Sequence, residues 1–328
     1  MLPLADRFGR VATDLRVSLT DRCNLRCSYC MPAEGLDWLP DEQTLSDDEI
    51  VRLITIAVTR LGVTEVRFTG GEPLVRRGLV DIVRRTSGLG VETSVTTNAL
   101  GLQRTAVALR DAGLDRINVS LDSIRPETFA EITRRDRLRD VIAGLAAAKD
   151  AGLGPVKINA VLLRGVNDDQ APELLRWSLE HDYHLRFIEQ MPLDAQHGWH
   201  RDQMITADEI FDRLSTEFTL TPHGVPRGSA PAELFDVDGG PGTVGVIASV
   251  TRPFCGDCDR VRLTADGQVR NCLFAREESD LRTAMRAGAT DAELADRWVI
   301  AMAGKRAGHG IDDPSFLQPD RPMSAIGG

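Results

Sequence analysis

The chain has 328 residues, of which 42% are hydrophobic and 27% charged, and its formal net charge at pH 7 is −10. These proportions describe a folded globular protein and exclude a disordered, collagen-like or disulfide-framework chain. The acidity argues against a general binder of nucleic acid or anionic membranes, because such binding needs many basic contacts to phosphate. An anionic ligand would therefore need a local cluster of basic residues.

The apolar segments alternate between strand-like and helix-like patterns. Strand-like runs occur at residues 15–20, 65–69, 91–97, 116–122, 156–163 and 184–190, and amphipathic helical stretches at 47–61, 102–112, 139–151 and 170–181. Six strand–helix repeats predict an α/β fold with a parallel sheet. Eight repeats would close a full barrel of about 250 residues, so six predict an incomplete (β/α)6 TIM-like barrel.

The pattern changes after one more expected helix at residues 206–218. Residues 221–245 are rich in Pro and Gly and predict a loop-heavy boundary, followed by short strands at 246–250 and 260–264. We therefore expect a partial barrel over residues 1–220 and a C-terminal domain over 221–328. No apolar run reaches the roughly 18 to 20 residues of a membrane span, and the N-terminus lacks a signal-peptide stretch, so we expect a cytoplasmic protein.

Six cysteines form two groups of three. Cys23, Cys27 and Cys30 make C-x3-C-x2-C, and Cys255, Cys258 and Cys272 make C-x2-C-x13-C. Disulfides are disfavoured because cytoplasmic thiols stay reduced. A structural zinc site needs four ligands, which His181, His184, His197 or His200 could complete. Two triads are better explained by iron–sulfur clusters in which one iron stays open for a small molecule.

Four expected strands carry a cation where a barrel interior is usually apolar: Arg16, Arg67, Lys157 and Arg186. A buried unpaired cation is costly, so these side chains together predict a polyanionic ligand. The alternative is that each one pairs with a nearby carboxylate or reaches solvent.

Three further segments stand out by their position. Arg260 and Arg262 follow Cys258 and share one face of an extended segment, which favours a nucleotide site beside an open cluster. Residues 69–73, TGGEP, follow a strand, and their glycines allow a ligand to approach the backbone closely. The chain ends in Ile326-Gly327-Gly328, and a Gly-Gly end is usually frayed.

The C-x3-C-x2-C loop with Tyr29 before its last cysteine, together with the GGEP segment, resembles the radical S-adenosylmethionine (SAM) enzymes. Nearly the whole chain, from DLRVSLTDRCNLRCSYC through VRFTGGEPLVRR, VKINAVLLRGVND and LRFIEQMPL to CGDCDRVRLTADGQVRNCLF and the terminal IGG, resembles one radical SAM family. That family comprises the GTP 3',8-cyclases of molybdenum cofactor biosynthesis, which have a second, C-terminal 4Fe–4S cluster.

The resemblance implies a role for each matching residue. Cys23, Cys27 and Cys30 would hold the first 4Fe–4S cluster, and Cys255, Cys258 and Cys272 the second, whose open iron would take the guanine base. SAM would contact Tyr29, Gly71, Ser120 and Met191. GTP would contact Arg16, Arg67, Thr96, Lys157, Arg260, Arg262 and the backbone of Val261. Arg186 is implied as a further basic site residue, and Gly327 and Gly328 as a tail that enters the active site.

The implied reaction converts GTP to (8S)-3',8-cyclo-7,8-dihydroguanosine 5'-triphosphate, the first step of molybdenum cofactor biosynthesis, with SAM and two 4Fe–4S clusters as cofactors. The implied partners are GTP, a flavodoxin- or ferredoxin-like reductant, the downstream cyclic pyranopterin monophosphate synthase and a second copy of the chain in a homodimer. Nucleic acid and membranes are not expected partners. Two alternatives stay open: another radical SAM enzyme with an auxiliary cluster, such as a peptide maturase, and a zinc or iron–sulfur interaction module.

Overall fold

The computed structural model describes residues 3–327. Its strands are β1 Asp14–Ser18, β2 Glu65–Thr69, β3 Glu92–Thr97, β4 Arg116–Ser120, β5 Lys157–Val161, β6 His184–Ile188, β7 Leu220–Pro222, β8 Glu233–Val237, β9 Thr243–Ile247, β10 Arg260–Leu263, β11 Gln268–Arg270 and β12 Ser279–Asp280. Its helices are α1 Asp47–Leu61, α2 Leu79–Ser87, α3 Ala106–Asp111, α4 Pro126–Thr133, α5 Leu138–Asp150, α6 Ala171–Glu180, α7 Ala207–Leu214, α8 Arg282–Arg286, α9 Asp291–Ala303 and α10 Met323–Ile326.

The strands form one open sheet in the order β12-β11-β10-β1-β2-β3-β4-β5-β6-β9-β8-β7. From β10 to β9 every neighbouring pair is parallel, while β11, β12, β7 and β8 join the two edges antiparallel. The six expected parallel strands are therefore confirmed. Residues beyond 220 lengthen both edges of the same sheet.

Alternation along the strands decides which side chains face the lumen. In β2, Val66 and Phe68 are fully buried in the apolar core, whereas Arg67 between them is only partly buried. In β6, Leu185 and Phe187 are buried in the same core and flank Arg186. Because successive side chains of a strand point to opposite faces, the apolar ones pack against the helices and the basic ones turn inward.

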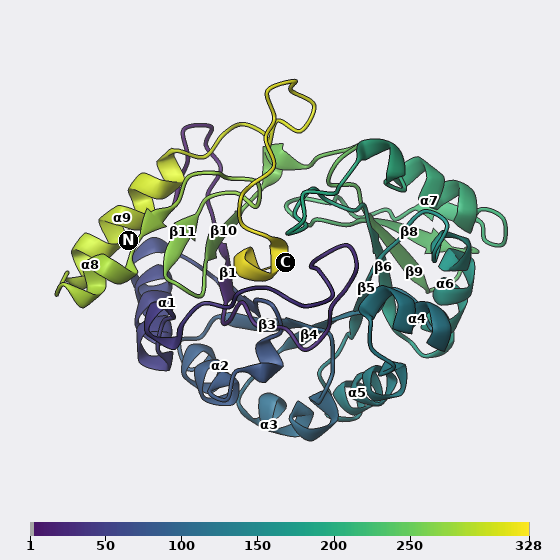
Figure 1. The fold of residues 1–328 in the computed structure, drawn as a ribbon, viewed down its shortest axis with the longest axis horizontal. Helices are drawn as coiled ribbons and strands as arrows, with labels where there is room; N and C mark the ends of the chain where they lie inside the picture. Colours follow the sequence, from purple (N-terminus) through teal and green to yellow (C-terminus); the bar gives the residue numbers. More distant parts are fainter. Residues whose placement is uncertain (1–2, 328) are drawn as a thin grey trace.

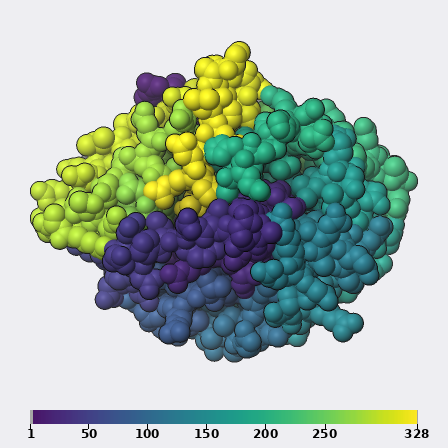
Figure 2. All heavy atoms as spheres, viewed as in Figure 1, coloured from purple at the N-terminus to yellow at the C-terminus, as the bar shows by residue number. Residues whose placement is uncertain are grey.

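The helices lie on the outside of the curved sheet, and the end of the chain lies within the ring of elements (Figure 1). In the space-filling view the C-terminal segment, in yellow, lies between the yellow-green part of the chain on the left and the teal part on the right. Purple N-terminal atoms lie directly below it (Figure 2). The chain terminus thus covers part of the barrel opening. Within residues 3–327, no helix is both long and apolar enough to cross a membrane.

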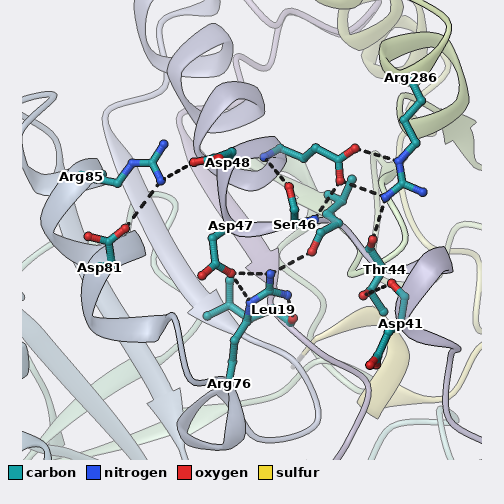
Figure 3. Close-up of polar contacts among 12 residues, drawn as sticks. Leu19, Asp41, Thr44, Ser46, Asp47, Asp48, Arg76, Asp81, Arg85 and Arg286 are labelled. Atoms are coloured by element: carbon teal, nitrogen blue, oxygen red, sulfur yellow. Dashed lines mark hydrogen bonds and ion pairs between the residues drawn. The ribbon is translucent and has the colours of Figure 1, made fainter.

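Two arginines contact the start of α1 (Figure 3). Arg286 connects it to the C-terminal part of the chain, and Arg76 connects it to the TGGEP segment. Ser46 and Glu49 form a reciprocal capping box that begins α1. The Arg286 guanidinium donates to both carboxylate oxygens of Glu49, at 2.7 and 2.9 Å, which connects α8 to α1. Arg76 donates to Asp47 at 2.6 Å and to the Leu19 carbonyl at 2.7 Å. These contacts fix the loops that follow β1 and β2.

Some expected elements differ from the structure. Residues 221–245, expected to be a loop-heavy boundary, also contain strands that were not expected: Glu233–Val237 forms β8, and β9 begins at Thr243. The expected helix at 102–112 is a 3₁₀ turn, Leu102–Arg104, followed by α3, because the backbone leaves helical geometry at Thr105. The expected helix at 206–218 ends earlier, at Leu214.

Candidate active site

The first cysteine triad lies in the loop after β1. Cys23, Cys27 and Cys30 are half-buried free thiols. A tight turn brings them together, since the Cys30 amide donates to the Cys27 carbonyl at 2.9 Å. Burial raises the pKa of Cys27 well above its usual value, and the nearby Cys30 and Cys23 add to that rise. The three sulfurs therefore lie close enough to interact through their charges.

The donor chemistry of the two triads fits 4Fe–4S clusters. Each triad offers three free cysteine thiols. Such a cluster can take each cysteine on a different iron and leave the fourth iron open. The four histidines considered as zinc ligands, His181, His184, His197 and His200, are all exposed.

The TGGEP segment lies directly against the entry to the cysteine loop. The Gly71 amide donates to the Thr20 carbonyl at 2.7 Å, and the Glu72 amide donates to the Arg22 carbonyl at 2.8 Å. A Cβ on Gly71 would lie 2.3 Å from the Asp21 carbonyl oxygen and 2.4 Å from that of Arg22. Glycine is required here because two backbone segments meet without room for a side chain.

A buried carboxylate supports this junction, and the sequence patterns did not reveal it. Glu72 accepts hydrogen bonds from the Thr97 hydroxyl at 2.6 Å and from the Asn98 amide at 2.7 Å. Burial raises the pKa of Glu72 to about 7. The Asn98 side chain in turn donates to Asn24 at 2.7 Å and lies 3.9 Å from the Cys23 sulfur. Glu72 thus connects the end of β3 to the first triad.

Of the residues expected to contact SAM, Tyr29 has the best-defined partner. Its hydroxyl donates to Asp122 at 2.9 Å, and Asp122 also accepts from the Val161 amide at 2.8 Å. Burial raises the pKa of Asp122 to about 6. Ser120 ends β4 beside Asn159, and Met191 lines the main cavity of the barrel. These residues lie near the carboxyl ends of the strands, where such barrels place their sites.

A cavity that is partly open to solvent occupies the barrel opening. Its wall brings together residues expected to bind GTP and all three cysteines of the second triad. The expected residues on this wall are Arg16, Arg67, Thr96, Arg186, Met191, Arg260, Arg262, Cys255, Cys258 and Cys272. Asn159, Phe254, Phe274 and His309 also line it and carried no sequence pattern that marked them.

The strands around the lumen present more positive than negative charge. Their seven cations are Arg16, Arg67, Arg116, Lys157, Arg186, Arg260 and Arg262, and four carboxylates, those of Asp14, Glu65, Glu92 and Asp259, pair with some of them. Seven minus four leaves an excess of three positive charges. Arg16 forms an ion pair with Asp14 at 3.5 Å, and Arg67 forms one with Glu65 at 2.9 Å. The alternative that these cations pair with nearby carboxylates therefore holds in part.

The excess charge shows in the basic side chains themselves. Burial, with repulsion from Arg67 and Arg116, lowers the pKa of Arg186 to about 10. Burial likewise lowers the pKa of Arg16 to about 10. The buried Arg16 Nε and Arg260 Nη2 atoms have no hydrogen-bond partner in the part of the chain that the structure describes. Such donors on a cavity wall fit an anionic ligand.

Two expected GTP contacts lie away from the cavity wall. Lys157 begins β5 and is partly buried, and it is repelled by Arg116 and Arg186 on the neighbouring strands β4 and β6. The Val261 side chain is fully buried in the apolar core, so only its backbone is oriented for a ligand. The sequence-based assignment of both stays a prediction.

The tail reaches the site, as the resemblance implied for Gly327. The Arg262 guanidinium donates to the Gly327 carbonyl, and the Gly327 amide donates to Met323 at 2.8 Å. Gly327 has φ +85°, and a Cβ there would lie 2.5 Å from Thr69 Cγ2. The Ser324 amide also hydrogen-bonds Cys30. The tail therefore lies between the first triad and the basic cavity; Gly328 lies outside the described residues.

Comparisons with known proteins agree with this arrangement. Residues 17–178 match the model of the radical SAM superfamily, and residues 183–311 match the model described as Molybdenum Cofactor Synthesis C. A protein of Streptomyces coelicolor named GTP 3',8-cyclase is 67% identical, with 99% of this chain and 96% of that protein covered. A protein of Mycobacterium tuberculosis named GTP 3',8-cyclase 2 is 61% identical, with 99% of this chain and 92% of that protein covered.

The solved structures show the same fold at low identity. Streptococcus suis SuiB, crystallised with its precursor peptide SuiA, superposes with a TM-score of 0.62 at 15% identity, covering 90% of this chain and 67% of that one. SuiB bound to S-adenosylmethionine superposes with a TM-score of 0.58 at 14% identity, covering 87% and 68%. Together with the identity to its full-length relatives, this places the chain in the GTP 3',8-cyclase family of radical SAM enzymes.

Proposed function

We propose that this chain converts GTP to (8S)-3',8-cyclo-7,8-dihydroguanosine 5'-triphosphate with SAM, the first step of molybdenum cofactor biosynthesis. The observation that carries the proposal is a cavity lined both by arginines that have buried donors without a hydrogen-bond partner and by the three cysteines of the second triad. Full-length relatives named GTP 3',8-cyclase support this activity over a peptide maturase, since the peptide-bound SuiB shares only the fold. A zinc or iron–sulfur interaction module would not need the basic lumen.

The first triad would hold a 4Fe–4S cluster, and Tyr29, Gly71, Ser120 and Met191 would contact SAM. When bound, this cluster and SAM together supply a 5'-deoxyadenosyl radical that takes the 3' hydrogen of the GTP ribose. The chain's own task is to orient the ligands and to exclude water and other hydrogen donors. The close backbone approach at Gly71 and the Glu72 hydrogen bonds keep the cysteine loop and the TGGEP segment in a fixed relation.

The basic residues of the lumen would hold the triphosphate. Arg16, Arg67, Thr96, Lys157, Arg260, Arg262 and the Val261 backbone are the proposed contacts, with Arg186 as a further cation. Three excess positive charges neutralise most of a triphosphate and fix the ribose, which is catalysis by positioning. Cys255, Cys258 and Cys272 would hold the second 4Fe–4S cluster, whose open iron would take the guanine base in the same cavity.

The remaining assignments extend the same proposal. Residues 1–220 would act as the SAM-binding part and 221–328 as the part that carries the second cluster and the tail. We propose a flavodoxin- or ferredoxin-like reductant, the downstream cyclic pyranopterin monophosphate synthase as the enzyme that takes the product, and a homodimer. The cytoplasm is the proposed location, since both clusters need reduced thiols.

The cluster assignment predicts a specific iron content. After anaerobic reconstitution the protein should hold about eight irons per chain, because each 4Fe–4S site contributes four. It should then cleave SAM when GTP is present and not when peptides replace GTP. Iron and zinc analysis with chromatography of the SAM products measures both. Zinc in place of iron, or SAM cleavage indifferent to GTP, would contradict the assignment.

Lys157 should make GTP use depend on pH. Burial and repulsion from Arg186 and Arg116 lower the pKa of Lys157 to about 8. The ammonium form, which attracts phosphate, is therefore present below pH 8 and lost as the pH rises through that value. We expect kcat/KM for GTP, which reports the free enzyme, to fall about tenfold per pH unit above 8.

Two variants separate Lys157 from other titrating groups. Lys157→Arg keeps its charge throughout this range, so its profile should lose the break near pH 8. Lys157→Ala should weaken GTP use far more than SAM binding, measured as two affinities. An unchanged break in the arginine variant would show that another group titrates.

A further inference from the structure

The second triad has a buried cation of its own, Lys305, which no part of the proposed function uses. Lys305 follows α9, and only 2% of its surface is exposed. Its ammonium nitrogen donates to the Arg260 carbonyl at 2.9 Å and to the Cys258 carbonyl at 3.2 Å. The same nitrogen lies 3.3 Å from the Cys258 sulfur. These three acceptors match the three N–H donors of an ammonium group.

No carboxylate lies within ion-pair distance of Lys305 anywhere in residues 3–327. A buried cation is costly to leave without an opposite charge. Two of its acceptors are neutral carbonyl oxygens, so the Cys258 sulfur is the one that can bring a negative charge. The charge of Lys305 is therefore directed at the sulfur of a proposed cluster ligand.

The three cysteines of this triad differ in their surroundings. The Arg260 Nε atom lies 3.4 Å from the Cys258 sulfur, so two cations face that one ligand. At Cys255 the neighbouring cation, Arg10, donates to the backbone carbonyl, at 2.6 Å. Positive charge is thus concentrated on one corner of the triad.

We propose that Lys305 is a positioning residue for the second cluster, holding Cys258 through its backbone carbonyl and its sulfur and raising the reduction potential of the cluster. A hydrogen bond and a positive charge at a ligand sulfur stabilise the reduced form of an iron–sulfur cluster. This proposal rests on the second cluster of the proposed function. It adds that one buried charge, which does not line the cavity, sets the electronic state of that cluster.

Arg10 offers a matched control on the same loop. Its guanidinium donates to the Cys255 carbonyl at 2.6 Å and to the Ala307 carbonyl at 2.9 Å, and pairs with Asp6 at 2.5 Å. Arg10 therefore holds the cysteine loop through backbone oxygens alone, whereas Lys305 also reaches a sulfur. Arg10→Lys keeps the charge and weakens the contacts to the backbone oxygens and to Asp6, none of which involves a cysteine sulfur.

The test uses the full chain with Cys23, Cys27 and Cys30 replaced by Ala, so that iron reports the second site alone. Lys305→Gln keeps an N–H donor for the carbonyls and removes the charge, Lys305→Met removes both, and Lys305→Arg restores the charge. Iron content and the midpoint potential, from a redox titration followed by electron paramagnetic resonance, are measured for each variant and for Arg10→Lys.

We expect Lys305→Gln to bind iron as its parent does and to show a lower midpoint potential, which Lys305→Arg shifts back toward the parent. Arg10→Lys should keep the parental potential. A midpoint potential in Lys305→Gln equal to that of the parent would overturn the proposal. This holds even if Lys305→Met loses its iron, because the role of Lys305 would then be structural. An equal shift in Arg10→Lys would overturn it too. A parent that binds no iron would instead refute the second cluster itself.

Discussion

Gly327→Ala is expected to lower GTP turnover about 100-fold while leaving the iron content unchanged. Gly327 has φ +85°, which costs a residue with a Cβ about 1–2 kcal/mol. The added methyl would also lie 2.5 Å from Thr69 Cγ2, so the tail could not keep its position. The hydrogen bond from Arg262 to the Gly327 carbonyl would then be lost. Steady-state turnover of GTP and iron analysis measure the two effects.

Gly310→Ala is the matched control for this substitution. Gly310 lies in the same C-terminal region and also has positive φ, +73°, but a Cβ there would have no atom within 4 Å. It carries the same backbone penalty without the collision at the site. Equal losses of GTP turnover in the two variants would show that only the stability of the C-terminal tail matters. That result would contradict a specific role for the position of Gly327 beside Thr69 and Arg262.

Gly71→Ala should reduce SAM cleavage about 100-fold and lower the iron content toward the four irons of the second site. Its Cβ would collide with the carbonyl oxygens of Asp21 and Arg22, at 2.3 and 2.4 Å. Backbone atoms cannot move aside as a flexible side chain can, so the cost lies near the upper end of overpacking, about 3 kcal/mol. The displaced segment leads directly into Cys23.

Gly224→Ala is the comparison for Gly71→Ala. Gly224 has no positive φ, and a Cβ there meets nothing within 4 Å, so its iron content and SAM cleavage should stay at the level of the unmodified protein. The account of Gly71 would be wrong if Gly71→Ala retained all its iron and full SAM cleavage in anaerobic assays.

The sequence was most informative where periodicity and burial agree. The strand at 65–69 and the helix at 47–61 have the expected bounds, because alternating apolar residues, a capping box and the glycine at position 62 all act locally. β8 was missed because its ELFDV segment lies between stretches rich in Pro and Gly, and it forms a strand by pairing with β9. Such pairing is a long-range property that a local pattern does not contain.

The candidate site divides in the same way. Cysteine spacing and the basic residues of strands are local patterns, and they identified eight of the 21 residues that line the cavity. Glu72, Asn98 and Lys305 were not assigned a role, because each acts through a partner distant in the sequence, as Lys305 does through Cys258. Single polar residues inside ordinary loops and helix ends carry no spacing signal. Only the folded arrangement shows what they contact.

The product formed from GTP tests the central claim most directly. The reconstituted protein is incubated anaerobically with GTP, SAM and a chemical reductant, and the nucleotide products are separated and identified by mass spectrometry and nuclear magnetic resonance. The account predicts a product with the mass of GTP and a new bond between the ribose C3' and guanine C8, formed together with 5'-deoxyadenosine. Unchanged GTP alongside cleaved SAM, or a product without that bond, would contradict it.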